Sequence, residues 1–270
     1  MSTDPVIALD VMGGDGGPSV TIAAAEIAHR RYPKLRFRLF GREDLIRAEL
    51  AKAPRIAKDA VIVHADEEIL GTDRPSQVLR RARHSSMGLA IDAVKAGEAL
   101  AAVSAGNTGA LMAISTIQLR TIPGLSRPAI AAIWPTIRGQ TIVLDVGATV
   151  DSDARQLVDF AILGDAYARV VLGLDRPNVG LLNMGAEEMK GNEAVKAAAA
   201  ALRAPGVPLR FHGFVEGDDI RAGTVDVVVT SGFTGNIALK TAEGTARVFG
   251  QFLKDAIKST ILSRLGAVLA

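Results

Sequence analysis

Residues Ala101–Gly109 read AAVSAGNTG and are followed by a helix-like run, Ala110–Leu119. The order is an apolar strand, a loop of glycines and small polar residues, and a helix. Such a loop exposes main-chain N–H groups at the N-terminus of the helix, where the free donors and the helix dipole both favour an anion. The loop therefore predicts a site for phosphate or a phosphate-like group. A plain strand-to-helix turn is the alternative, because glycine, serine and asparagine are common turn residues.

The same alternation of strands and helices extends along the whole chain. The predicted strands are residues 6–11, 35–40, 60–64, 99–104, 141–146, 178–183, 209–213 and 225–230. The predicted helices are residues 19–31, 77–96, 110–119, 152–173 and 192–204, with further helices from 43 and from 237. Strands that alternate with helices form parallel βαβ units. We predict an α/β fold with a three-layer, doubly wound, mostly parallel sheet, as a single domain over residues 1–270.

Composition excludes several classes of protein. The net charge of the 270 residues is +2, and no basic run is interleaved with aromatic residues, so nucleic-acid binding is not expected. The chain has no cysteine, which rules out disulfides, a thiolate acyl-enzyme and cysteine-ligated zinc. The four histidines have no ligand spacing, and no GxGxxG opens a helix, so neither a metal nor a nicotinamide cofactor is expected. The first ten residues lack the features of a signal peptide, and no apolar stretch reaches the roughly 18 residues of a spanning helix.

Ligands of open α/β sheets lie at the carboxyl ends of the strands. Five loops at these ends carry glycines, amides, carboxylates and lysines. The candidate site residues are Asp10, Gly13, Gly14, Asp15, Ser104, Gly106, Asn107, Thr108, Asn183, Lys190, Asn192, Asn236 and Lys240. Each has a structural alternative: the glycines as turns, Asp10 as a turn or cap residue, Lys190 as a solvated surface lysine, and the asparagines at 183, 192 and 236 as helix caps.

In sequence the chain resembles the bacterial phosphate acyltransferase family over nearly its whole length. The segments that carry the resemblance are ALDVMGGDGGPS, RHSSMGLAIDAVKAGEALAAVSAGNTGALMA, PGLSRPAIAAIWPT, LDVGATVD, YARVVLGLDRPNVGLLNMGAEEMKGN, FVEGDDI and GFTGNIALKTAEG. The resemblance implies a fold similar to the isopropylmalate dehydrogenase and phosphotransacetylase group. It also implies a soluble, cytoplasmic homodimer that moves a fatty acyl group from acyl-acyl-carrier protein to inorganic phosphate for phospholipid synthesis, without a metal or nicotinamide.

This resemblance gives the candidate residues a chemical hypothesis. Inorganic phosphate is itself the nucleophile, so the protein must hold a dianion beside a thioester and stabilise an oxyanion. The Ser104–Thr108 loop is expected to bind phosphate. Lys190 is expected to neutralise phosphate or the oxyanion, and Asn236 to donate to the thioester oxygen. Asp10 and Asp15 are expected to order the glycine turn.

Three residues depart from the family's usual pattern. Thr149 replaces an asparagine, Ser231 an aspartate, and His84 an aspartate. The chain also ends several tens of residues before its family members do, so we expect it to lack their last segment. Two alternatives remain open: a phosphotransacetylase-like enzyme acting on acyl-coenzyme A, and a catalytically weak scaffold that binds acyl-carrier protein or membrane.

The C-terminal stretch is basic and amphipathic. Lys254, Lys258 and Arg264 alternate with isoleucine, leucine and valine. Such a segment can lie on an anionic bilayer, so we expect a peripheral membrane contact through Ile257–Ala270. The family resemblance supports this expectation, and a helix that packs in the homodimer is the alternative.

Overall fold

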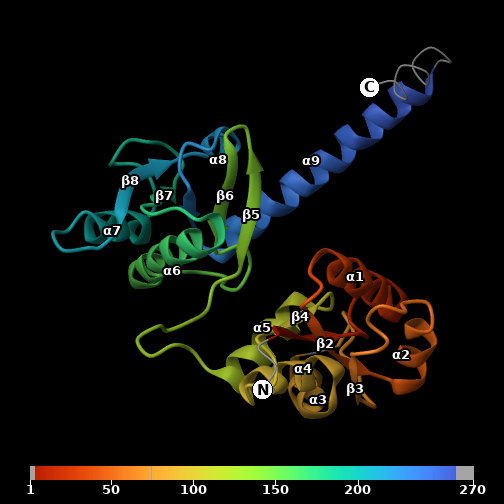
Figure 1. Ribbon diagram of the computed structural model, residues 1–270. Helices are drawn as coiled ribbons and strands as arrows, with labels where there is room; N and C mark the ends of the chain where they lie inside the picture. Colours follow the sequence, from red (N-terminus) through yellow and green to blue (C-terminus); the bar gives the residue numbers. More distant parts are fainter. Residues whose placement is uncertain (1–3, 74, 260–270) are drawn as a thin grey trace. The chain divides into compact units, whose positions relative to one another are not determined.

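The structure is a computed structural model that describes residues 4–73 and 75–259. The chain divides into two compact units, residues 1–123 and 124–270. Each unit has its own sheet and its own apolar core, and each is described by itself (Figure 1). The prediction of a single domain over residues 1–270 concerns both units together and stays a prediction.

The first unit contains a parallel sheet of four strands in the order β3-β2-β1-β4. The strands are β1 (Val6–Asp10), β2 (Arg36–Gly41), β3 (Val61–His64) and β4 (Ala101–Ser104). The register places Asp10 opposite Ser104, so β1 and β4 end at the same edge of the sheet. The loops that follow these two strands are therefore neighbours.

Helices cover both faces of this sheet. They are α1 (Gly17–Arg31), α2 (Glu43–Leu50), α4 (Ser86–Lys95) and α5 (Thr108–Leu119). Successive side chains of a strand point to opposite faces. Leu9 accordingly packs with Ile22 of α1 and Ile46 of α2, whereas Ala8 packs with Ala90 of α4. Side chains of β1 therefore contribute to the apolar cores on both faces of the sheet.

The single helix predicted over residues 77–96 is wrong. Helix α3 (Pro75–Arg81) gives way to a 3-10 turn, η1 (Ala82–His84), and α4 starts afresh at Ser86. The backbone of Ser85 is extended, and its hydroxyl accepts a hydrogen bond from the Gly88 N–H at 3.1 Å. The N–H of Ser86 donates to the Glu67 carbonyl at 3.0 Å. A serine cap and a tertiary hydrogen bond therefore interrupt a helix that the apolar spacing alone would continue.

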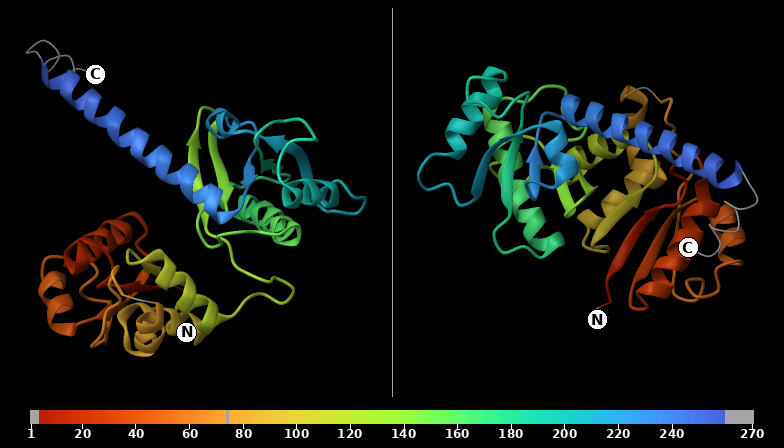
Figure 2. Two further views of the ribbon diagram at one scale, coloured as in Figure 1. Left: turned by 180° about the vertical axis from the view of Figure 1, so that it is seen from behind. Right: turned by 90° about the horizontal axis from the view of Figure 1, so that it is seen from above.

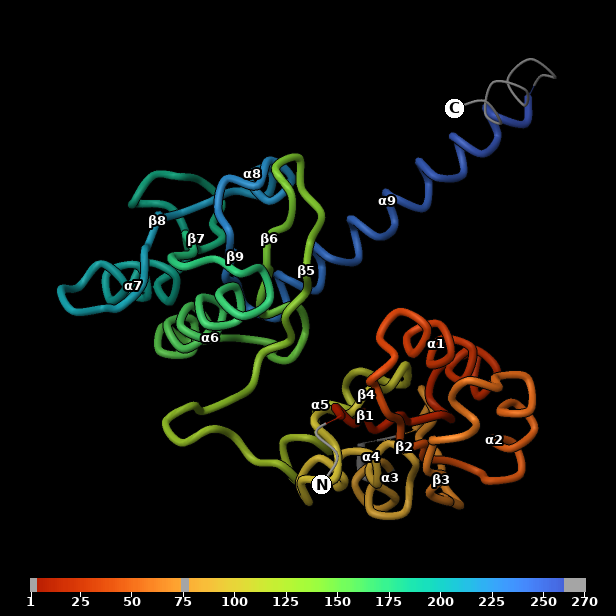
Figure 3. Tube along the Cα trace, viewed as in Figure 1, coloured from red at the N-terminus to blue at the C-terminus, as the bar shows by residue number. Residues whose placement is uncertain are grey.

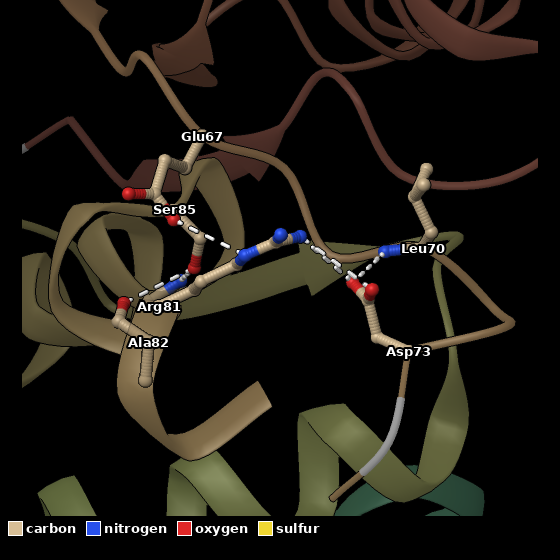
Figure 4. A network of polar contacts seen from close by, with 7 residues as sticks. Glu67, Leu70, Asp73, Arg81, Ala82 and Ser85 are labelled. Atoms are coloured by element: carbon tan, nitrogen blue, oxygen red, sulfur yellow. Dashed lines mark hydrogen bonds and ion pairs between the residues drawn. The ribbon is translucent and has the colours of Figure 1, made fainter. Parts of the chain in front are cut away.

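The end of α3 is fixed by charge. Arg81 lies between two carboxylates, with its Nε 3.7 Å from Glu67 Oε2 and its Nη1 3.5 Å from Asp73 Oδ1 (Figure 4). The Ser85 hydroxyl also donates to the Ala82 carbonyl at 3.1 Å. These contacts hold the turn that delivers α4 to the sheet, and α4 brings Ser86 to Asp10.

The second unit contains a sheet of five strands in the order β5-β6-β9-β7-β8. Strand β5 (Ala131–Thr136) is antiparallel to β6 (Gly139–Leu144), and β7 (Asn178–Leu182), β8 (Arg210–Val215) and β9 (Val227–Val229) pair in parallel. Strand β9 lies between β6 and β7 (Figure 3). Its three valines are fully buried. Continuous burial is typical of a parallel strand that is covered on both faces.

Helices also cover both faces of the second sheet. Helices α6 (Ala154–Leu172) and α7 (Glu193–Leu202) share a core with Val227 and Val229. On the other face, Val228 packs with Ile220 of α8 (Gly217–Ala222) and with Leu239 of α9 (Gly232–Ser259). The rest of α9 extends away from this sheet (Figure 2). No helix in the described ranges is both long enough and apolar enough to cross a bilayer.

The α/β class with mostly parallel pairing is confirmed, and two sheets take the place of the one expected. Strand β5 was not predicted, because Trp134-Pro135 interrupts its pattern; proline is tolerated there since β5 is an edge strand. Helix α8 was also missed, and α9 begins at Gly232 rather than at residue 237. The glycines of GFTGN suggested a loop, but they lie in the first turns of the helix.

Candidate functional site

Asp10, at the end of β1, is a buried carboxylate that holds two serines of the first unit. Its Oδ1 accepts from the Ser86 hydroxyl and its Oδ2 from the Ser104 hydroxyl, both at 2.6 Å. The Ser104 oxygen in turn accepts the Gly106 N–H at 3.0 Å. Because a hydroxyl has one proton, Ser104 has none left for a ligand. Its geometry orders the loop after β4 instead of adding the donor that we expected.

The two glycine loops of this unit are in main-chain contact. A Cβ atom on Gly13 would lie 2.7 Å from Asp10 Oδ2 and 2.8 Å from Ser104 Oγ. Gly14 has φ +84°, and a Cβ atom there would lie 2.7 Å from the Ala105 carbonyl oxygen. Only glycine fits such an approach and such a backbone. The MGGDGG and SAGNTG loops therefore form one structure at the ends of β1 and β4.

The start of α5 carries the donors that remain for an anion. Asn107 is the N-cap of this helix, and its Oδ1 accepts the Ala110 N–H at 2.9 Å. Asn107 and Thr108 are exposed, and the Asn107 side chain binds only one of the N–H groups that the first turn of a helix leaves free. Asp15 is also exposed and makes no hydrogen bond or ion pair with a described residue. The start of α5 thus offers neutral donors.

The most connected carboxylate of the second unit, Asp145, was not among the candidate residues. It is fully buried after β6, and its Oδ1 accepts the N–H groups of Ile130, Gly147 and Ala148 at 2.9–3.0 Å. Its Oδ2 accepts the N–H and the hydroxyl of Thr149 at 2.8 and 2.9 Å. One carboxylate therefore shapes the whole DVGAT loop. Its signal in the sequence was an acidic residue directly after a buried strand.

Thr149, where the family usually has asparagine, makes its hydrogen bonds with buried groups of the second unit. Its hydroxyl donates to Asp145 and accepts the N–H of Gly232, the first residue of α9, at 3.1 Å. Its oxygen lies 2.9 Å from Ser152 Oγ, and Ser152 must be the donor because the threonine proton is already used. Thr149 is therefore buried and links the DVGAT loop to α9.

Asn236 lies beyond the first turn of α9 and is exposed. The N-cap alternative for it is wrong, because the helix begins at Gly232. A Cβ atom on Gly147, which has φ +144°, would lie 3.0 Å from Asn236 Nδ2. A Cβ atom on Gly235 would collide with the Asp145 carbonyl oxygen. The glycines of GFTGN thus let α9 approach the DVGAT loop closely and bring the Asn236 amide over it.

Asn183 braces the loop that carries Lys190. Its Nδ2 donates to the carbonyl oxygens of Gly185 and Lys190, both at 3.0 Å. Gly191 has φ +98° and packs against the Asn183 amide. Asn192 caps α7 by accepting the Val195 N–H at 2.8 Å. The cap alternative therefore holds for Asn192, whereas Asn183 ties the two ends of the loop together.

Both candidate lysines are exposed and paired. Lys190 Nζ lies 2.8 Å from Glu187 Oε1, and Lys240 Nζ lies 2.9 Å from Glu243 Oε2. The hydrogen bond to Glu187 raises the pKa of Lys190 above its ordinary value, and the same bond lowers the pKa of Glu187. Lys190 is therefore a cation at neutral pH and is already matched with a carboxylate.

A pocket of about 450 Å³ opens in the second unit at the ends of β7 and β9. Its polar lining is neutral apart from Asp151. The amides and hydroxyls that line it are Asn183, Asn192, Ser152, Thr230, Ser231 and Thr234. Two candidate residues and the unusual Ser231 therefore meet in one cavity. Lys190, Lys240 and Asn236 do not line it, and the described residues contain no cluster of three or more metal-ligating side chains.

Comparisons with known proteins identify the family of the chain. The model of the family described as "Fatty acid synthesis protein" matches residues 6–270. The chain is 58% identical to the phosphate acyltransferase of Parvibaculum lavamentivorans over 271 residues, which is 100% of this chain and 75% of that one. It is 53% identical to the phosphate acyltransferase of Paramagnetospirillum magneticum over 270 residues, 100% of this chain and 77% of that one.

Solved structures match the fold at low sequence identity. A phosphotransacetylase from Streptococcus pyogenes has a TM-score of 0.66 at 16% identity and covers 92% of this chain and 83% of its own. The EutD phosphotransacetylase from Staphylococcus aureus has a TM-score of 0.63 at 18% identity, with 91% and 83% covered. These likenesses confirm the predicted fold group alone. The full-length sequence matches decide the family: the chain belongs to the fatty acid synthesis protein family and, within it, to the phosphate acyltransferases.

Proposed function

We propose that the protein transfers a fatty acyl group from acyl-acyl-carrier protein to inorganic phosphate, which gives acyl phosphate for phospholipid synthesis. The observation that carries the proposal is the match to phosphate acyltransferases over the entire chain, including every loop at the strand ends. The likeness to phosphotransacetylases concerns the fold.

The reaction needs no protein nucleophile. An oxygen of hydrogen phosphate attacks the thioester carbonyl, a C–O bond forms, the C–S bond breaks, and the phosphate proton ends on the released thiol. The protein has to position the two reactants and neutralise the charge that develops on the carbonyl oxygen. The chain has no cysteine, so transfer through a protein thioester is excluded.

The described residues supply donors for both tasks. We assign phosphate to the N–H groups and side chains at the start of α5, around Asn107 and Thr108. Lys190 supplies a positive charge in the second unit, and breaks its ion pair with Glu187 to do so. The amide of Asn236 donates to the thioester oxygen from its place over Gly147. Asp10, Asp145 and Asn183 hold the loops in place.

Helix α9 supports a homodimer and a peripheral membrane contact. Its exposed apolar residues include Val248, Phe249, Phe252 and Leu253, each with at least half of its surface accessible. Lys254 follows them, and a basic amphipathic helix of this kind binds anionic lipid or a second copy of itself. Most of the predicted Ile257–Ala270 tip lies outside the described residues. Sedimentation of the protein with and without anionic vesicles separates the two roles.

Release of free carrier protein from a long-chain acyl-acyl-carrier protein tests the proposal, with hydroxylamine trapping the acyl phosphate. We expect turnover that requires inorganic phosphate. Turnover with acyl-coenzyme A and none with the carrier-protein thioester would point to the phosphotransacetylase-like alternative. Carrier-protein binding without turnover would favour the scaffold alternative.

A further inference from the structure

We propose that the pocket of the second unit binds the neutral pantetheine-type arm that presents the acyl thioester. The inference rests on the proposed function and deepens it, because it assigns a part of the substrate to a cavity within one unit. The pocket, of about 450 Å³, lies between the ends of β7 and β9 and the first turns of α7 and α9. Its size falls within the range of about 300–1,000 Å³ that is usual for small-molecule sites.

The hydrogen-bonding groups of the pocket match secondary amides. Ser231 Oγ donates to Thr234 Oγ1 at 3.2 Å, so the Thr234 proton is free to donate to a ligand. The oxygen of Ser231 is left as an acceptor. The Nδ2 of Asn183 is committed to two carbonyl oxygens, which leaves its Oδ1 as a second acceptor. A secondary amide both donates and accepts one hydrogen bond, and a pantetheine arm carries two such amides.

Apolar side chains complete the lining. Leu157 is 2% exposed, and together with Leu182, Met184 and Val195 it forms the apolar part of the wall. Burial of methylene and methyl groups against these residues contributes about 25 cal/mol per Å² of apolar surface. A pantetheine arm has apolar segments between its polar groups, so its composition resembles that of the wall.

The charge of the pocket disfavours phosphate as the occupant. Neither lysine nor arginine is among the described residues that line it, and Asp151 adds a carboxylate. The N-termini of α7 and α9 favour an anion by about 0.3–1 kcal/mol each, which is small against the cost of burying a dianion without a cation. Lys190 precedes the lining residue Gly191, so the proposed cation stands beside the pocket rather than in it.

Titration of the full chain with D-pantetheine, followed by ligand-observed NMR, tests the assignment, with inorganic phosphate titrated in parallel. Val195→Phe narrows the pocket from α7. Val170→Phe is the matched control, because Val170 lies on α6 with 83% of its surface exposed. Thr234→Val keeps the shape of an exposed side chain and removes its hydroxyl donor. If Val195→Phe does not fold, this variant still tests whether the pocket binds D-pantetheine.

We expect Val195→Phe to weaken D-pantetheine binding by about tenfold or more, and Thr234→Val by a smaller factor. Val170→Phe should bind like the unmodified protein, and phosphate affinity should be unchanged in all three variants. Unchanged D-pantetheine affinity in Val195→Phe and Thr234→Val overturns the assignment, as does a loss confined to phosphate or an unmodified protein that binds no D-pantetheine. If the protein bound D-pantetheine but did not transfer an acyl group, the proposed function would be refuted and the assignment of the pocket would stand.

Discussion

The hydroxyl of Thr149 lies 2.9 Å from Asp145 Oδ2 and accepts the main-chain N–H of Gly232 at 3.1 Å. Residues 83 positions apart are thereby joined through one oxygen atom. The consequence is that the DVGAT loop and the first turn of α9 are one rigid structure. Asn236, which we assign to the thioester oxygen, is oriented by it.

Removal of that hydroxyl should destabilise the second unit. Thr149→Val leaves the N–H of Gly232 and the hydroxyl of Ser152 without their buried partner, and we expect a loss of roughly 1–3 kcal/mol in the free energy of unfolding. Urea denaturation measures it. Thr149→Ser keeps the hydroxyl and should lose much less, and Thr245→Val on an exposed face of α9 is the control. Equal losses for Thr149→Val and Thr149→Ser would show that the methyl group matters instead.

Loss of the proposed cation should abolish turnover and spare the fold. Lys190→Ala removes an exposed side chain, so thermal stability should change little, whereas acyl transfer should fall by about a hundredfold or more if Lys190 neutralises phosphate or the oxyanion. Lys196→Ala is the control, because it breaks an ion pair of the same i,i+3 spacing with Glu193 in the same unit. Retained activity in Lys190→Ala removes this residue from the mechanism.

The ion pair between Lys190 and Glu187 predicts a pH dependence. The pKa of Lys190 is raised, so its charge is present below the ordinary value of 10.5 and is lost only as the pH rises through the higher pKa. The pKa of Glu187 is lowered from 4.5, so the pair persists until the pH falls through that lower value. Glu187→Gln should therefore move the alkaline limb of the activity profile to lower pH. Glu193→Gln is the control and should leave the alkaline limb of the profile unchanged. If Glu187→Gln also left this limb unchanged, the assignment of the limb to Lys190 would be contradicted.

The two hydrogen bonds by which Asn183 holds the loop that carries Lys190 can be tested separately. Asn183→Ala removes both donors that join Gly185 to Lys190, so we expect faster hydrogen exchange in residues 184–191 and slower acyl transfer. Asn183→Asp keeps the size of the side chain but sets a carboxylate against two carbonyl oxygens, and should be worse. If Asn183→Asp exchanges as slowly as the unmodified protein, the two hydrogen bonds do not hold the loop.

The sequence was sufficient wherever a local pattern carries the signal. Apolar runs of strand length fixed the buried strands such as β9, and the glycine after α6 ends that helix at Gly173 with φ +69°, as a left-handed cap should. The cap alternative for Asn192 is confirmed, because an amide directly before a helix satisfies one of its free N–H groups. The order of these elements along the chain was enough to predict an α/β fold.

Only the tertiary structure decided how the polar side chains are used. Ser86 and Ser104 meet Asp10 across 76 and 94 residues, so the fate of each hydroxyl proton depends on strand register and helix packing rather than on neighbours in sequence. Tertiary contacts also decide the break between helices at Ser85, the hydrogen bonds of the Thr149 hydroxyl and the presence of a pocket at Ser231. Local patterns predict which elements form, but a hydroxyl has one proton, and folding over long range determines which acceptor receives it.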